Sequence, residues 1–301
     1  MSRWIATAAL AAAALLVASA AQAAEKVTLE HDDLTLVGHM KEGMGASPSD
    51  GVVLMLHGTL AHGRMEVMAG VQDLLAEHGL NSLSINLSYG IDAREGMFEC
   101  DAPVRHGVDD HLQEVSLWHE WLQDEGYGPV TLFGHSRGAN QVARYLIEHD
   151  PDGIRALVLV AASTFDEDEA AADFEEQSGL PLQVMLDRAR ELQRMNQEET
   201  LMEDVRFLYC EELDVTPRAF LGYYEPTRQN DTPSVIRGMQ IPTLVIVGSE
   251  DDVVPDLPQK VEAVKDSGDI TLMTVDGADH FFRDFFADDV ADFTADFIDQ
   301  N

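Results

Sequence analysis

The feature that most constrains the fold is a repeated alternation of short apolar runs with longer stretches of helical periodicity. GVVLMLHG, residues 51–58, is a continuous apolar run that ends in glycine, as is typical of a strand buried on both faces. Residues 65–79 then carry apolar side chains at helical spacing, and Gly79 marks the end of that helix. Such alternation predicts a mostly parallel sheet with helices on both faces.

The alternation continues to the end of the chain. Residues 27–40 alternate enough to predict an edge strand or a short hairpin. Further strands are predicted at residues 81–87, 129–136, 156–163, 243–251 and 270–280. Further helices are predicted at residues 104–124, 138–149 and 286–298. The predicted fold class is therefore α/β, with one large core.

Residues 165–235 interrupt this rhythm. They contain helical runs such as PLQVMLDRARELQRM without a clear buried strand, and they begin with the acid-rich DEDEAAADFEEQ. Acidic side chains stabilise the first turns of helices through the helix dipole, so this acid-rich stretch is compatible with a helix start. The alternative is that it forms a solvated mobile segment. We interpret the interval as a helical cap inserted between two parts of the core, residues 24–164 and 236–301.

Residues 1–23 have the pattern of a secretory signal peptide. Arg3 is their only charge, an apolar run rich in alanine follows, and Ala21-Gln22-Ala23 offers a cleavage site between small residues. An uncleaved membrane anchor is the alternative. Cleavage after Ala23 would place the mature protein in the periplasm or outside a bacterial cell, so residues 1–23 are excluded from the predicted fold.

The charge balance is strongly acidic, with 19 basic against 55 acidic residues. This excess disfavours nucleic acid and anionic membranes as partners. Because the acidic residues are spread over the whole chain, we infer that they keep the protein surface solvated and do not form a substrate-binding patch. A protein exposed to high salt tolerates such self-repulsion because the charges are screened, so a halophilic, salt-exposed protein is a hypothesis that the composition supports.

The stretch LFGHSRGAN contains Gly134-x-Ser136-x-Gly138, which chance alone supplies in roughly one chain in ten of this length. Its context adds meaning, because the apolar run PVTLF enters the pattern and the helical pattern RGANQVARYLIEH leaves it. This is the setting of a nucleophile elbow, a sharp strand-to-helix turn that exposes a serine. Ser136 is therefore the candidate nucleophile, and it needs a neighbouring base to remove its proton.

Eleven histidines could supply that base. In this architecture catalytic groups lie at the carboxyl ends of the strands, and His280 follows the last predicted strand in VDGADHFF. His57 and His135 also lie at strand ends, but each is better explained by shaping its own turn. We therefore predict His280 as the base.

A carboxylate is needed to orient the imidazole and to stabilise its charged form. GSEDDVVP places Asp251 in the loop after the strand at 243–251, and Asp251 is the predicted partner. The alternatives are its neighbours Glu250 and Asp252 and, after an earlier strand, Asp166. The chain order serine, acid, histidine is the one expected for the hydrolase elbow.

The tetrahedral intermediate of acyl transfer needs two donors for its oxyanion. The backbone N–H of Arg137, directly after the serine, is one candidate. The backbone N–H of Thr59, in the loop HGTLAHGRM after an early strand, is the other.

With these residues in place, the sequence resembles the α/β-hydrolase superfamily over nearly the whole mature chain. The resemblance is carried by HGT at 57–59, GHSRG at 134–138, GSEDDVVP at 248–255 and GADHFF at 277–282. It implies an eight-stranded, mostly parallel sheet, a variable cap after the sixth strand, and a serine, acid and histidine triad that uses no metal and no organic cofactor. The stretches HGTLAHGRMEVM and INLSYGID look like a little-characterised secreted bacterial subgroup.

Two features are not explained by the resemblance. Arg137 is charged where many relatives have an apolar residue or glutamine; we favour a salt bridge to a nearby acid, with a substrate carboxylate as the alternative. Cys100 and Cys210 are the only cysteines, and an oxidising compartment permits them to form a disulfide, the alternative being two separate buried thiols.

The predicted function is that of a secreted serine esterase acting on a small-molecule carboxylic ester through an acyl-enzyme. An amidase or peptidase uses the same groups, and a binding protein without turnover uses the same fold. The acidic cap sequence disfavours a lipase that acts on lipid droplets.

Overall fold

The computed structural model of the protein describes residues 23–301. The predicted signal peptide therefore lies, except for its last residue, outside the described residues. Within the described part of the chain, no helix combines the length and apolar character needed to span a membrane.

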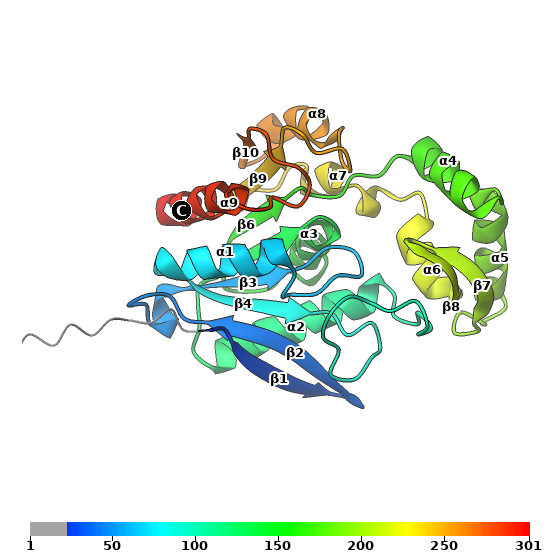
Figure 1. Ribbon diagram of the computed structural model, residues 1–301, viewed down its shortest axis with the longest axis horizontal. Coiled ribbons are helices and arrows are strands. Elements are labelled where there is room, and N and C mark those ends of the chain that lie inside the picture. Colours follow the sequence, from blue (N-terminus) through cyan, green and yellow to red (C-terminus); the bar gives the residue numbers. More distant parts are fainter. Residues whose placement is uncertain (1–22) are drawn as a thin grey trace, which may run out of the picture.

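An eight-stranded sheet forms the centre of the molecule (Figure 1). Its strands are β1 (Glu25–His31), β2 (Leu34–Lys41), β3 (Val52–Leu56), β4 (Asn81–Asn86), β5 (Val130–His135), β6 (Ile154–Val160), β9 (Thr243–Gly248) and β10 (Ile270–Val275). They lie in the order β1-β2-β4-β3-β5-β6-β9-β10. Only β2 runs against its neighbours, and all other pairings within the sheet are parallel. The α/β-hydrolase fold class predicted from the sequence is confirmed.

Helices cover both faces of this sheet. Helices α1 (Glu66–Glu77) and α9 (Phe286–Gln300) pack together on one face, whereas α2 (Val108–Asp124) and α3 (Arg137–His149) pack together on the other (Figure 1). A short helix, α8 (Leu257–Glu262), packs against β9 and β10. Strands β3, β5 and β9 are buried along their whole length, which explains their uninterrupted apolar sequences.

The parallel strands bring their carboxyl ends to one edge of the sheet. Thr59 follows β3, Ser136 follows β5, Asp251 follows β9 and His280 follows β10. Residues far apart in the sequence are thus delivered to the same edge by topology alone.

One predicted helix begins later than expected. The sequence predicted a helix from residue 104, but α2 begins at Val108. Val104 instead pairs with Val215: its N–H donates to the Asp214 carbonyl at 2.8 Å, and its own carbonyl accepts from Thr216 N–H at 2.9 Å. Pairing with a distant part of the chain overrides the local helical pattern here.

The cap is inserted between β6 and β9, and it forms a lobe beside the core (Figure 1). It consists of α4 (Glu167–Ser178), α5 (Leu182–Arg194), β7 (Met202–Phe207), β8 (Cys210–Val215), α6 (Pro217–Tyr224) and α7 (Thr232–Ile236). Its own core is aromatic, with rings in mutual contact from Phe174, Phe207, Phe220, Tyr223 and Tyr224.

Strands β7 and β8 form an antiparallel hairpin that the sequence did not predict. The pairing is irregular, with register shifts on both sides of Val205. Buried residues consequently fall at Met202, Val205 and Phe207, so the alternation that identifies a regular strand is absent.

Candidate active site

Ser136 lies at a strained turn between β5 and α3. Its backbone has φ 55° and ψ −123°, a region that residues with a side chain rarely adopt. A Cβ added at Gly134 would lie 2.5 Å from Ala139 backbone atoms, and one at Gly138 would lie 2.3 Å from the His57 carbonyl oxygen. Glycine is therefore required on both sides of the serine, as the elbow geometry predicts.

The structure brings Ser136, His280 and Asp251 into one hydrogen-bonded chain. Ser136 Oγ lies 3.0 Å from His280 Nε2, and His280 Nδ1 lies 2.9 Å from Asp251 Oδ2. Only 5% of the His280 side chain and 4% of the Asp251 side chain are exposed, so water competes weakly for these bonds. With Nδ1 protonated, the imidazole donates to Asp251 and leaves Nε2 free to accept the serine proton.

The carboxylate of Asp251 is held in its charged form. Burial alone would raise the pKa of Asp251, but the hydrogen bond and charge of His280 lower it, together with the N–H groups of Val254 and Val253. These two N–H groups donate to Oδ1 at 3.1 and 2.9 Å. The net direction is downward, so a carboxylate faces the imidazole at neutral pH.

The alternative acids lie elsewhere. Glu250 and Asp252 are exposed. The Asp166 side chain accepts from the N–H groups of Asp168 and Glu169 and thereby caps α4. The geometry therefore selects Asp251 as the carboxylate in contact with His280.

His57 and His135 have structural partners. His57 Nδ1 lies 2.8 Å from the Gly58 carbonyl oxygen, and its Nε2 accepts from Leu87 N–H at 3.1 Å. His135 Nε2 lies 2.8 Å from the His280 carbonyl oxygen, which fixes the backbone of the candidate base. Burial lowers the pKa of His135 to about 4, with a further contribution from the charge of His280, so its imidazole is neutral.

The backbone N–H groups of Thr59 and Arg137 are the candidate oxyanion donors. Thr59 and Ser136 line the same cavity, and Gly58 packs so closely on Ser136 that a Cβ there would lie 3.1 Å from the serine Cβ. In residues 23–301, the N–H groups of Thr59 and Arg137 donate to no other residue. These two N–H groups therefore remain the candidate donors to an oxyanion.

The Arg137 side chain contacts the cap, not a carboxylate. Its Nη2 donates to the Gly222 carbonyl at 3.0 Å and to Asn230 Oδ1 at 3.3 Å, and its guanidinium lies 4.6 Å from the centre of the Tyr223 ring. The salt bridge favoured from the sequence is wrong, because burial under the cap leaves no acid within reach in the described residues. The same burial lowers the pKa of Arg137 from its ordinary value.

The candidate site opens into a cavity of about 430 Å³. Its wall is mostly apolar and includes Ala61, Met65, Val67, Met97, Tyr209, Val253 and Phe281. Two charged residues, Glu66 and Arg283, also line it. A cavity of this size accommodates a small organic substrate.

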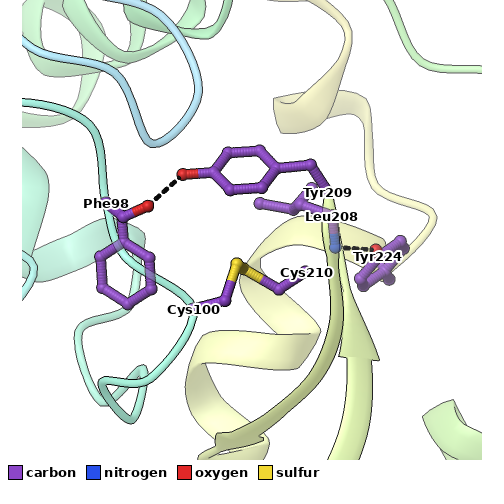
Figure 2. Close-up of a disulfide and its surroundings, with 6 residues drawn as sticks. All are labelled: Phe98, Cys100, Leu208, Tyr209, Cys210 and Tyr224. Carbon is purple, nitrogen blue, oxygen red and sulfur yellow. Dashed lines mark hydrogen bonds between the residues drawn. A yellow bond between two sulfur atoms is a disulfide. The ribbon is translucent and has the colours of Figure 1, made fainter.

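Cys100 and Cys210 are joined by a disulfide that links the loop after β4 to the cap hairpin (Figure 2). Their Cα atoms are 5.5 Å apart across a sequence separation of 110 residues. Tyr209, adjacent to Cys210, lines the cavity but could not be selected from the sequence, because nothing local distinguishes it from other cap aromatics.

Comparison with known proteins supplies a family and a set of similar folds. The sequence pattern of the alpha/beta hydrolase family matches residues 53–296. No curated protein matches the chain in sequence.

Similar solved structures include Est1E from Butyrivibrio proteoclasticus with bound ferulic acid, with a TM-score of 0.67 and 17% identity over 91% of this chain and 98% of that one. A Pyrococcus furiosus esterase has a TM-score of 0.60 and 18% identity over 92% of this chain and 90% of that one. The Paleococcus ferrophilus monoacylglycerol lipase has a TM-score of 0.58 and 17% identity over 88% of this chain and 99% of that one. At these identities the likeness concerns the fold.

Proposed function

The chain belongs to the alpha/beta hydrolase family, and on that premise we propose that it is a serine esterase that cleaves small carboxylic esters. The observation that carries the proposal is the hydrogen-bonded chain from Ser136 Oγ through His280 to Asp251, with separations of 3.0 and 2.9 Å. Esterases and lipases among the similar folds support the same reaction class, and the ferulic acid bound to Est1E supports a small substrate.

The proposed reaction begins when the ester carbonyl binds beside Ser136. His280 Nε2 takes the hydroxyl proton as Oγ attacks the carbonyl carbon, and Asp251 stabilises the imidazolium that forms. The negative charge moves to the carbonyl oxygen, where the N–H groups of Thr59 and Arg137 donate to it. Removal of one such donor typically lowers kcat by about 10²- to 10³-fold.

The intermediate then collapses and the alcohol leaves. His280 gives its proton to the departing alkoxide oxygen, and an acyl group remains on Ser136 Oγ. Water enters the vacated position, loses a proton to His280 and attacks the acyl carbon. The acid leaves as Ser136 recovers its proton, so one ester and one water yield one acid and one alcohol.

A fluorophosphonate probe tests the nucleophile directly. We expect the wild-type protein to be labelled stoichiometrically and the Ser136→Ala variant to remain unlabelled in intact-mass measurements. If neither protein is labelled, the protein is a binding protein on this fold and the catalytic proposal is wrong.

A substrate panel tests the reaction class. We expect p-nitrophenyl esters to be hydrolysed by the wild type and a peptide and anilide panel to be left intact. Cleavage of the peptides without cleavage of the esters would replace the esterase with an amidase or peptidase.

We also propose that the protein is secreted and that salt stabilises it. The support is the signal-peptide pattern of residues 1–23, the Cys100–Cys210 disulfide, and a net charge of −36. Mass spectrometry of the exported protein should give Ala24 as the first residue. Raising the salt concentration from about 0.1 to about 2 M shortens the Debye length from about 10 to about 2–3 Å. A melting temperature that does not rise over this range would contradict the proposed stabilisation by salt.

A further inference from the structure

Tyr209 is the cap residue that lines the cavity of Ser136. It lies at the tip of the β7–β8 hairpin, and 45% of it is exposed. A large aromatic side chain held open to solvent contributes little to the packing of the cap. Tyr209 and Ser136 line the same cavity, so a molecule bound beside the serine can cover the exposed ring of Tyr209.

The hydroxyl of Tyr209 is already engaged. It donates to the Phe98 carbonyl at 2.6 Å, as Figure 2 shows. A phenol whose proton is committed to a backbone carbonyl has no donor left to offer a ligand. Tyr209 therefore presents its ring to the cavity, and the hydrogen bond fixes the orientation of that ring.

Two further contacts hold the hairpin tip in place. Cys210 is joined to Cys100, and the N–H of Leu208 donates to Tyr224 Oη at 2.8 Å (Figure 2). Leu208 has φ 55°, a conformation that is costly for a residue with a side chain and persists only where its surroundings enforce it. The position of Tyr209 is thus set by three separate contacts on three consecutive residues.

The same contacts reach the loop that carries Thr59. Phe98 accepts from Tyr209 through its carbonyl, and its N–H donates to the Leu60 carbonyl at 3.0 Å. The segment from Phe98 to Cys100 therefore lies between the cap hairpin and the loop after β3. The disulfide ties that segment to the hairpin, so the wall made by Tyr209 is fixed relative to the serine.

The rest of the wall matches an aromatic ligand. Phe281 supplies a second ring, and Met65 and Met97 supply thioethers, which contact aromatic rings favourably. Arg283 also lines the wall, and its guanidinium lies 4.6 Å from the centre of the Phe281 ring and donates to Asp279 at 3.2 Å. Apart from Glu66 and Arg283, which is paired with Asp279, the side chains of the wall are mostly rings, thioethers and aliphatic groups.

We propose that Tyr209 is the specificity-determining residue of the site, that it binds an uncharged aryl group of the ester, and that the Cys100–Cys210 disulfide holds it in position. This inference rests on the proposed esterase function and names its substrate class.

Methyl phenylacetate and methyl cyclohexylacetate form a matched pair of substrates, because they differ in the ring and not in the reacting carbonyl. We expect Tyr209→Ala to lower the ratio of their kcat/KM values by about tenfold, through KM, with kcat unchanged. Tyr209→Leu, which keeps apolar bulk, should lower the ratio similarly. Val184→Ala, at another exposed cap position outside the cavity, should leave it unchanged.

Binding to the Ser136→Ala variant separates recognition from catalysis. In that background, Tyr209→Ala should raise the calorimetric Kd for methyl phenylacetate by about tenfold. An unchanged Kd together with an unchanged kcat/KM ratio would overturn the inference. If the protein with Ser136 hydrolyses neither ester and Ser136→Ala still binds methyl phenylacetate through Tyr209, the proposed function fails and the recognition stands.

The disulfide is tested in the same assay. Cys100→Ser should shift the kcat/KM ratio toward that of Tyr209→Ala. If this variant does not fold, the wild type can be reduced instead, because its Cys100 is exposed, and the same shift is expected. If the Cys100→Ser variant and the reduced wild type both keep the kcat/KM ratio of the untreated wild type, the disulfide does not position Tyr209.

Discussion

The α/β core and the cap place their functional side chains in different ways. In the core, Ser136, Asp251 and His280 each follow a strand of one sheet, so their mutual positions depend on the register of β5, β9 and β10. In the cap, Tyr209 lies on a two-residue hairpin tip and depends on a disulfide and two hydrogen bonds.

This difference indicates a division of roles. A mostly parallel sheet with buried central strands has few alternative registers, because a slip would expose apolar residues and lose many hydrogen bonds. It therefore suits groups that must stay within hydrogen-bonding distance. Individual contacts on a short hairpin can be changed one at a time, so the cap suits the part of the site that contacts variable groups of a substrate.

The largest expected effect is on the chemistry of the core. Asp251→Asn should lower kcat on p-nitrophenyl butyrate by about 10⁴-fold, because the amide no longer stabilises the protonated imidazole or selects its tautomer. Steady-state kinetics check this, with Asp252→Asn as the matched control at an exposed neighbouring position. A loss below tenfold in Asp251→Asn would mean that the carboxylate has no role in turnover.

Glycine substitutions compare the stability of the two regions. At Gly138 an added Cβ would lie 2.3 Å from the His57 carbonyl oxygen, so Gly138→Ala should lower the free energy of unfolding by about 3 kcal/mol or prevent folding. At Gly179, which ends α4 with φ 71°, nothing lies within 4 Å, and Gly179→Ala should cost about 1 kcal/mol. If urea denaturation gave equal losses of unfolding free energy for Gly138→Ala and Gly179→Ala, the two regions would not differ in their tolerance of an added side chain.

Acid should destabilise the core through its buried histidines, whereas residues 167–236 contain no histidine. The pKa of His135 is about 4 in the folded protein against an ordinary value of 6.5, so unfolding takes up a proton between these values. Its contribution to stability is complete above pH 6.5 and falls as the pH drops toward 4, by about 3 kcal/mol at most.

The variant His135→Gln isolates this contribution. Glutamine can still donate to the His280 carbonyl, but it does not titrate. Its free energy of unfolding should fall less steeply than that of the wild type between pH 6.5 and 4. Parallel curves for the two proteins would assign the acid sensitivity to other groups.

Arg137 is one of the contacts between the core and the cap, so its loss should loosen the cap. Arg137→Met leaves the Gly222 carbonyl and Asn230 without their donor and should cost about 1 to 2 kcal/mol. Proteolysis within residues 167–236 should become faster. Arg144→Met is the control, since Arg144 is buried on the same helix and pairs with Glu148 instead; identical cleavage rates would exclude Arg137 as a tether.

The smallest effect should come from an ion pair within the cap. Arg190 donates to Glu225 at 2.7 Å, with about a third of each side chain exposed. Arg190→Gln should lower the free energy of unfolding by less than about 1 kcal/mol, and high salt should reduce that loss further. A larger loss of unfolding free energy that does not depend on salt would show that the Arg190–Glu225 pair is a main source of stability in the cap.

Much of the core could be predicted from the sequence for a physical reason. Strands buried on both faces have uninterrupted apolar sequences, and each was found close to its predicted range. Ser136, Asp251 and His280 could be selected because each lies just beyond such a strand. Helix α2 was placed four residues too early, because Val104 pairs with Val215 across the chain.

The sequence by itself therefore determined the class of the fold, the elbow at Ser136 and the order of the candidate catalytic groups, all of which depend on local apolar patterns. The tertiary structure alone decided that Arg137 contacts the cap backbone, that β7 and β8 form a hairpin, and that Tyr209 lines the cavity of Ser136. These outcomes depend on contacts between residues as far apart as Cys100 and Cys210, separated by 110 positions, and a local pattern carries no information about them.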